Sequence, residues 1–198
     1  MASSDVAEIC HELADRSLVV IDEAYQEFSE SEGFLALQAE CENVVLLRTL
    51  SKFASLAGVR CGALIGRPEL VGFLNNVLPP YTFPTPSIEL VMTALEKNSL
   101  QLSRERNALL RAERGRMTTE LANSPSVSRV WRSDANFVLI EVADGQAFAD
   151  VAHSAGILVR TFPNHPSLEN CIRITIGLRD DNDQLLSAVS KLEARNAD

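Results

Sequence analysis

The chain has 198 residues, 46% of them hydrophobic, and its 18 basic and 27 acidic side chains give a formal net charge of −9. This composition is typical of a globular protein with one core or two small ones. The basic residues form no run and are not interleaved with aromatic residues, which excludes the electrostatic surface of a nucleic-acid-binding protein.

Cysteine and histidine usage predicts neither a metal site nor a disulfide framework. The four cysteines lie far apart without a CxxC motif, and the three histidines form no pair at helical spacing. No stretch of 18 apolar residues occurs, and the N-terminus lacks a basic segment followed by an apolar one. We therefore expect a cytoplasmic protein that neither inserts into a membrane nor is secreted.

The first third of the chain predicts alternating helices and strands. Apolar residues at helical spacing predict a helix over 5–14, which Ser3 or Ser4 could cap. Short aliphatic runs predict strands at 18–21, 44–47 and 63–65, separated by stretches with helical pattern. The continuous run over 18–21 is typical of a strand buried on both faces, as in a parallel sheet. This order predicts an α/β fold.

The pattern changes in the second half. Prolines 79, 80, 84 and 86 end a helix that begins near Pro68, and a long helix is then predicted over about 87–121. After Asn123-Ser124-Pro125 we predict strands at 127–131, 135–141, 157–160 and 171–175, and helices at 146–154 and 181–195. We therefore predict a partial large domain over residues 1–85, a connecting helix over 86–111 and an α+β small domain over 112–198.

The segment Arg48-Thr49-Leu50-Ser51-Lys52 follows a buried strand, and Arg60 comes eight residues after it. A lysine there lies at the carboxyl end of a strand, where open α/β sheets bind ligands. The hydroxyls of Thr49 and Ser51 and the guanidinium of Arg60 are a suitable set for a phosphate dianion. The sequence thus predicts an amine beside a phosphate site.

Asp22 and Tyr25 end the preceding predicted strand and add a carboxylate and a phenol to the same region. A buried carboxylate can keep a pyridine nitrogen protonated, which makes the ring an electron sink. A phenol can form a hydrogen bond with an adjacent ring oxygen. These side chains together meet the needs of a pyridine cofactor with a phosphate group.

Each candidate residue also has a plainer interpretation when taken alone. A single loop lysine is usually a solvated surface charge, an Asp after a strand can cap a turn, and a half-buried tyrosine can belong to the core. Arg60 could form a surface ion pair, Arg173 could lie on a solvated strand face, and Asn136 could close a turn. The combination, rather than any single residue, carries the functional prediction.

In order and spacing the chain resembles the histidinol-phosphate aminotransferase family, within the fold-type I enzymes that use pyridoxal 5'-phosphate. The resemblance extends over nearly the entire chain, and five segments carry it: Val20-Ile21-Asp22-Glu23-Ala24-Tyr25-Gln26-Glu27-Phe28, Arg48-Thr49-Leu50-Ser51-Lys52, Leu56-Ala57-Gly58-Val59-Arg60-Cys61-Gly62, Ser133-Asp134-Ala135-Asn136-Phe137 and Cys171-Ile172-Arg173-Ile174-Thr175-Ile176-Gly177. It implies that the chain is the C-terminal part of the large domain followed by the small domain.

The resemblance also implies a role for each matched residue. Lys52 would bind the cofactor aldehyde covalently and act as the catalytic base, Asp22 would pair with the pyridinium nitrogen, and Tyr25 would contact the ring hydroxyl. The cofactor phosphate would be bound by Thr49, Ser51 and Arg60. For the substrate, Arg173 would bind the α-carboxylate and Arg160 the phosphate, with Asn136 at the same site.

The reaction implied is transamination of histidinol phosphate with 2-oxoglutarate in histidine biosynthesis, by a homodimer. The chain departs from the family at Phe53-Ala54-Ser55, where Ala-Phe followed by Gly or Ala is usual. It also lacks the family's N-terminal half, so we expect a truncated chain with little activity of its own. The alternatives are another enzyme of this fold, such as a threonine-phosphate decarboxylase or an aromatic aminotransferase, or an inactive fragment or paralogue that acts only as a binding or partner subunit.

Overall fold

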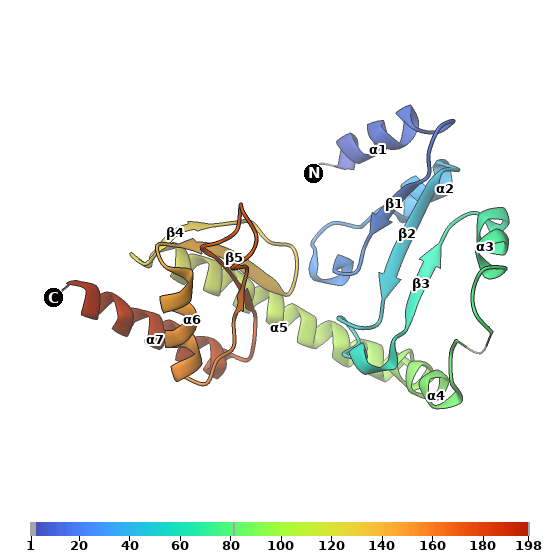
Figure 1. Ribbon diagram of the computed structural model, residues 1–198. Coiled ribbons are helices and arrows are strands. Elements are labelled where there is room, and N and C mark those ends of the chain that lie inside the picture. The colour runs from blue at the N-terminus through green and yellow to red at the C-terminus, as the bar shows by residue number, and fades with distance from the viewer. Residues whose placement is uncertain (1–2, 81, 198) are drawn as a thin grey trace. The chain divides into compact units, whose positions relative to one another are not determined.

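The computed structural model describes residues 3–80 and 82–197, with side chains up to Ser190. The chain divides into two compact units, Met1–Glu105 and Arg106–Asp198 (Figure 1). The domain limits predicted at residues 85 and 111 stay a prediction. No helix within the described ranges is long and apolar enough to cross a membrane.

Unit 1 contains a three-stranded sheet in the order β1-β2-β3. Strand β1 (Val19–Asp22) runs parallel to β2 (Val44–Thr49), and β3 (Gly62–Ile65) is antiparallel to β2. The three predicted strands are thus confirmed to within two residues. The sheet is mixed rather than purely parallel.

The helices of unit 1 include α1 (Ser3–Glu12) and α2 (Leu35–Glu40), and short 3-10 turns follow β1 and β2. Two more helices, α3 (Pro68–Asn75) and α4 (Thr85–Ala94), follow β3 and each begin with proline in the first turn. Proline suits that position because its missing N–H has no partner there in any helix. The break predicted near the Pro79-Pro80 pair is confirmed.

The hydrophobic cluster that forms the core of unit 1 lies on one face of its sheet, and on the other face Val45 of the central strand is also buried. Buried Cys10, Cys41, Val44 and Leu46 form this core with partly buried neighbours from β1, β3 and the first two helices. On the other face the side chains of Leu18 and Val20 are 55% and 57% exposed, and Leu64 is 37% exposed. The prediction that the first strand is buried on both faces is therefore wrong, because α1 and α2 supply cover for one face only.

Unit 2 is an α+β layer with the strand order β4-β5-β7-β6. All three pairings are antiparallel, and they involve β4 (Val127–Val130), β5 (Phe137–Val142), β6 (Arg160–Thr161) and β7 (Cys171–Thr175). Alternate residues of β5 and β7 are buried and pack with side chains from three helices: α5 (Lys97–Ala122), α6 (Gly145–Ser154) and α7 (Arg179–Ala197). The period-2 burial of β5 is typical of a strand with one covered face.

Two elements predicted in the second half of the chain, a helix over 87–121 and a strand over 157–160, are wrong in extent. The long helix over 87–121 is interrupted at residues 95–96, which separates α4 from α5. No proline or glycine lies near that break, and nothing in the local sequence explains it. Of the strand predicted over 157–160, only Arg160 lies in β6. Ile157 belongs instead to the cap of α6, which ends at Ser154: its N–H donates to the carbonyl of Ala152, just after the positive-φ Gly156.

A polar network joins α5 to the start of α7. One carboxylate oxygen of Glu113 accepts hydrogen bonds from Arg116 (2.8 Å) and from the buried Asn182 (3.0 Å). Arg116 also forms an ion pair with Asp183 at 2.7 Å. The hydrogen bonds from Arg116, and secondly from Asn182, lower the pKa of Glu113. The ionised form of Glu113 therefore stabilises this junction.

The exposed apolar face of the unit 1 sheet predicts self-association of the 198-residue chain. Hydrophobic side chains grouped at a sheet face without cover are sites of association. Replacing Leu18 and Val20 by threonine should lower the mass-average molar mass measured by light scattering on a sizing column at high concentration. Glu30→Gln, at another exposed position, should not. A wild-type chain that stays monomeric throughout the concentration range would contradict this.

Glu113→Gln should destabilise unit 2 by about 1–2 kcal/mol at pH 7, because a charge-assisted hydrogen bond becomes neutral. The folded pKa of Glu113 is below the unfolded one. The contribution of Glu113 to the stability of unit 2 is therefore complete above the pKa of the unfolded chain, about 4.3. It is lost as the pH falls through the folded pKa. Urea unfolding followed by the fluorescence of Trp131 should show the difference narrowing below that pH. The control is Glu120→Gln, on the exposed part of α5, and equal midpoints for wild type and Glu113→Gln at pH 7 would reject the assignment.

Candidate active site

The loops that follow β1 and β2 lie at the same edge of the unit 1 sheet (Figure 1). Parallel pairing places Asp22, the last residue of β1, opposite Leu47. Strand β2 ends two residues later, and Lys52 follows it. The carboxyl ends of neighbouring parallel strands are where open α/β sheets bind ligands. The predicted candidate residues of unit 1 therefore come from one edge.

Lys52 and Tyr25 are in contact at this edge. The Nζ of Lys52 lies 5.6 Å from the centroid of the Tyr25 ring. The lysine is exposed and the tyrosine half-buried. Among residues 3–80 and 82–190, no carboxylate forms an ion pair with the Lys52 ammonium. The amine is thus available for chemistry and is held near a phenol.

Asp22 organises the turn that leads to Tyr25. One of its carboxylate oxygens accepts a hydrogen bond from the N–H of Ala24 at 2.9 Å. This is the turn role that a plain interpretation of Asp22 predicts. The carboxylate is exposed, and it keeps further acceptor capacity for a second partner. Both roles are compatible in one side chain.

Two hydroxyls lie side by side where β2 ends. The Oγ1 of Thr49 is 2.9 Å from the Oγ of Ser51 and 3.1 Å from the carbonyl oxygen of Cys61, and it accepts a hydrogen bond from the Ser51 N–H at 3.0 Å. The contact with Cys61 ties the hydroxyl pair to the segment that enters β3. The Thr49 O–H donates within the loop here, but hydroxyl hydrogens rotate, so the pair can turn its donors to the oxygens of an anion.

The loop after Lys52 contains backbone strain. Ser55 and Arg60 both have φ of 58°, in the left-handed region that favours glycine. Strained positions of this kind cluster at functional sites. The exposed Arg60 donates one hydrogen bond to the carbonyl of Ala57 at 3.0 Å, which leaves most of its five donors unused by the loop. Its guanidinium can therefore still bind an anion.

The remaining candidates belong to unit 2. Arg173 on β7 is directly opposite Arg160 on β6, so both side chains project from the same face of that sheet. The Cζ of Arg173 lies 5.0 Å from the centroid of the Phe137 ring, and its buried Nε has no hydrogen-bond partner among the described residues. Two like charges at opposed positions are unfavourable without an anion. The backbone carbonyl of Asn136, the third candidate of unit 2, accepts a hydrogen bond from the N–H of Ile176 at 2.9 Å.

Sequence reasoning missed Glu23, which is 4% exposed. Its carboxylate forms an ion pair with Arg48 at 2.9 Å. A signal was present, because period-2 alternation puts Glu23 on the same covered face as Val19 and Ile21. A carboxylate on that face requires a partner, and Arg48 of the next strand provides it.

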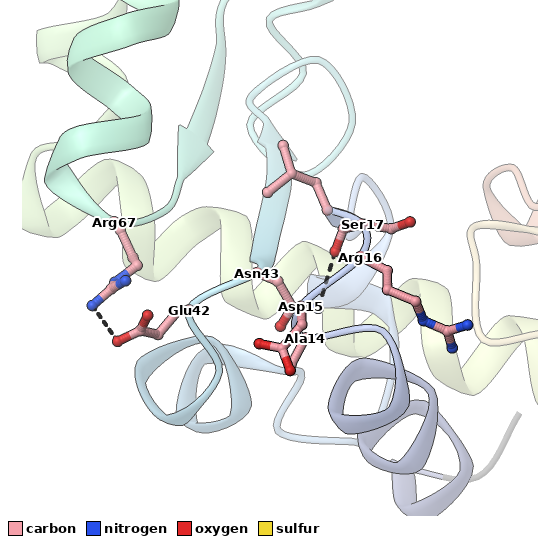
Figure 2. Close-up of a pocket in the computed structure, with 8 residues that line it drawn as sticks. Ala14, Asp15, Arg16, Ser17, Glu42, Asn43 and Arg67 are labelled. Atoms are coloured by element: carbon pink, nitrogen blue, oxygen red, sulfur yellow. Dashed lines mark hydrogen bonds and ion pairs between the residues drawn. The ribbon is translucent and has the colours of Figure 1, made fainter.

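A shallow hollow of about 410 Å³ lies at the opposite edge of the same sheet (Figure 2). Several of its polar side chains are engaged with one another or with the backbone. Arg67 pairs with Glu42, and the amide of Asn43 donates to the carbonyl of Ser17 at 3.2 Å. The hollow is at the amino ends of β1 and β2, whereas Lys52 follows the carboxyl end of β2. It is therefore separate from the candidate active site.

Comparison with known proteins identifies what this arrangement is similar to. The family model "Aminotransferase class I and II" matches residues 3–189. A histidinol-phosphate aminotransferase of Stenotrophomonas maltophilia is 39% identical over 194 residues, which is 98% of this chain and 53% of that protein. The chain thus spans about half the length of the relatives it matches.

Solved structures agree with the family match. The histidinol-phosphate aminotransferase of Clostridium acetobutylicum has a TM-score of 0.87 at 22% identity, covering 98% of this chain and 60% of that one. The enzyme of Sinorhizobium meliloti, solved in complex with pyridoxal-5'-phosphate, has a TM-score of 0.76 at 22% identity, covering 97% and 54%. These likenesses confirm the α/β fold. Because the family model matches residues 3–189, this chain belongs to the class I and II aminotransferases.

Proposed function

We propose that the chain carries the lysine-bearing part of a pyridoxal-phosphate site for transamination of histidinol phosphate with 2-oxoglutarate, in the cytoplasm. The observation that carries the proposal is the Lys52 amine beside the Tyr25 ring, at the sheet edge where Asp22 ends β1. The 39% identity to a histidinol-phosphate aminotransferase supports the choice of substrate. The proposal includes the homodimer that the resemblance to this family implies.

The residues at the edge fit the cofactor chemically. An exposed amine suits its aldehyde, a carboxylate suits its ring nitrogen and a phenol suits its ring hydroxyl. The paired hydroxyls of Thr49 and Ser51, with the unused donors of Arg60, suit its phosphate. When bound, pyridoxal phosphate supplies a protonated ring that withdraws electrons from the substrate α-carbon.

The roles of the side chains follow from this arrangement. Lys52 would bond the cofactor and, once the substrate amine has displaced it, would carry the proton from the substrate α-carbon. Asp22 would hold the proton on the ring nitrogen, and Tyr25 would donate a hydrogen bond to the ring oxygen. No step requires a metal ion, and no group of three His, Cys, Asp or Glu side chains in the described part of the chain is placed to bind one.

The arginine pair of unit 2 would select the substrates. A planar guanidinium binds a carboxylate through two parallel hydrogen bonds. Both 2-oxoglutarate and the amino acid formed from it carry a carboxylate. Arg173, whose Nε has no partner among the described residues, is proposed for that carboxylate. Arg160, opposite it, is proposed for the phosphate of histidinol phosphate. Binding of an anion would relieve the repulsion between the two cations.

The alternatives differ at the substrate. A decarboxylase or another aminotransferase of this fold would use the same Lys52 edge with different substrate contacts, and an inactive fragment would retain only binding. The residues of the cofactor edge are the same in all these cases, so they are tested first.

The proposal predicts selective labelling of Lys52. The sequence has three lysines, Lys52, Lys97 and Lys191. Pyridoxal phosphate followed by borohydride reduction should modify Lys52 at least about tenfold faster than Lys97, because a neighbouring phosphate site raises the local concentration of the aldehyde. Pyridoxal without its phosphate should lose that preference. Peptide mass spectrometry gives the site of labelling.

Thr49→Val and Arg60→Gln are the matched variants, since they remove phosphate donors but leave the amine. Both should lower the preference for Lys52. Equal labelling of the two described lysines by pyridoxal phosphate and by pyridoxal would reject the cofactor site.

A further inference from the structure

The carboxylate of Glu23 is the only charged side chain that is buried among the described residues. One oxygen accepts from the Nε of Arg48 at 2.9 Å, and the other accepts from the N–H of Phe34 at 2.7 Å. Its own N–H donates to the carbonyl of Leu47 at 2.8 Å, which extends the pairing of β1 with β2 by one residue. Glu23 is therefore bound to two parts of unit 1, strand β2 and the residue that begins α2.

Burial makes these contacts hard to replace. An ionised carboxylate without a partner inside a protein is costly, and removing one partner of a buried pair leaves an uncompensated charge. The loop is also built around this group. Gly33 has φ of 77°, and a Cβ at that position would lie 2.6 Å from the Oε1 of Glu23. Only glycine lets the loop approach the carboxylate so closely.

The position of Glu23 links it to the candidate active site. It lies between Asp22 and Tyr25 in sequence, and its partner Arg48 precedes Lys52 by four residues. The bond to Phe34 closes the loop that carries Tyr25, because it joins the start of that loop to its end. The carboxylate thus fastens both the Tyr25 loop and the β2 end that leads to Lys52.

Strand geometry excludes direct participation of Glu23 in the chemistry. Successive residues of a strand point to opposite faces, so Asp22 and Glu23 face opposite sides of the sheet. Arg48 and Thr49 alternate in the same way, and the ion pair of Glu23 with Arg48 lies on the face opposite to Asp22 and Thr49. Glu23 and Arg48 can therefore act on the site only through the backbone that connects them to Asp22 and Thr49.

We propose that Glu23 and Arg48 form a positioning pair that holds Asp22 and Tyr25 in register with Lys52 for the cofactor. This inference rests on the proposed function, since it concerns the same site. It assigns the site a residue that contacts neither the cofactor nor the substrate. Small displacements of positioned groups have large effects on reactions at such sites.

The test uses the 198-residue chain and two matched variants. Glu23→Gln keeps the size of the side chain and can still accept from Phe34, but it removes the charge that pairs with Arg48. The control, Glu42→Gln, removes the exposed pair with Arg67 at the other edge of the same sheet. Far-UV circular dichroism checks folding, and borohydride trapping of pyridoxal phosphate at Lys52 and absorbance of the bound cofactor against pH are the readouts.

Glu23→Gln should trap pyridoxal phosphate at Lys52 about tenfold more slowly than wild type, and Glu42→Gln should match wild type. The pH midpoint of the cofactor absorbance should move in Glu23→Gln by about half a unit or more, because Asp22 and Tyr25 would no longer contact the ring as before. A purely structural role would lower stability and leave this midpoint in place. The effects of Glu23→Gln and Arg48→Gln should be non-additive in the double variant.

The outcomes separate the two proposals. No selective trapping at Lys52 in the wild-type chain would reject the proposed function, and with it the positioning role. Selective trapping in wild type with equal rate and equal pH midpoint in a folded Glu23→Gln chain would overturn the positioning role alone. If Glu23→Gln does not fold, Arg48→Lys decides, since it keeps the charge but loses the Nε donor. A folded Arg48→Lys chain that traps as fast as wild type would also overturn it.

Discussion

The parallel pairing of β1 with β2 is the constraint on which the candidate site depends. It places Asp22 opposite Leu47, and so brings the segments after both strands to one edge. An antiparallel pairing would send Tyr25 and Lys52 to opposite ends of the sheet. A slip of one residue would turn Asp22 to the covered face and Glu23 to the other. The register therefore decides both which side chains reach the site and which support it.

Each face of the sheet has a distinct task. The face covered by α1 and α2 contains the apolar core and, at its end, the ion pair of the buried Glu23 with the half-buried Arg48. The other face presents Asp22 and Thr49, with exposed apolar side chains farther back along the strands. The stabilising contacts and the chemical groups are thus separated by one backbone layer. The ion pair on the covered face can therefore influence the exposed site only through the position of the backbone.

The limits of sequence reasoning follow from the same geometry. The aliphatic runs predicted the strands, because β-branched and aliphatic side chains favour extended backbone even where only one face is covered. The roles proposed for Lys52, Asp22 and Tyr25 came from resemblance, since a single loop lysine or turn aspartate is ambiguous by itself. Strand alternation placed Glu23 on the covered face, but its partners Arg48 and Phe34 and the close approach of Gly33 are contacts between segments far apart in the sequence, which no local pattern contains. The strained φ of Arg60 and the break before α5 are likewise set by tertiary context.

The central claim is that Lys52 is the reacting amine of a transaminase site. The most direct measurement is 2-oxoglutarate-dependent turnover of histidinol phosphate with excess pyridoxal phosphate. We expect little turnover from the 198-residue chain, which spans about half the length of its relatives. A version extended by the N-terminal half of those relatives should turn over at about 1 per second or more. In that extended protein Lys52→Ala should lower the rate by about 10²-fold or more. An unchanged rate in the Lys52→Ala protein would contradict the assignment.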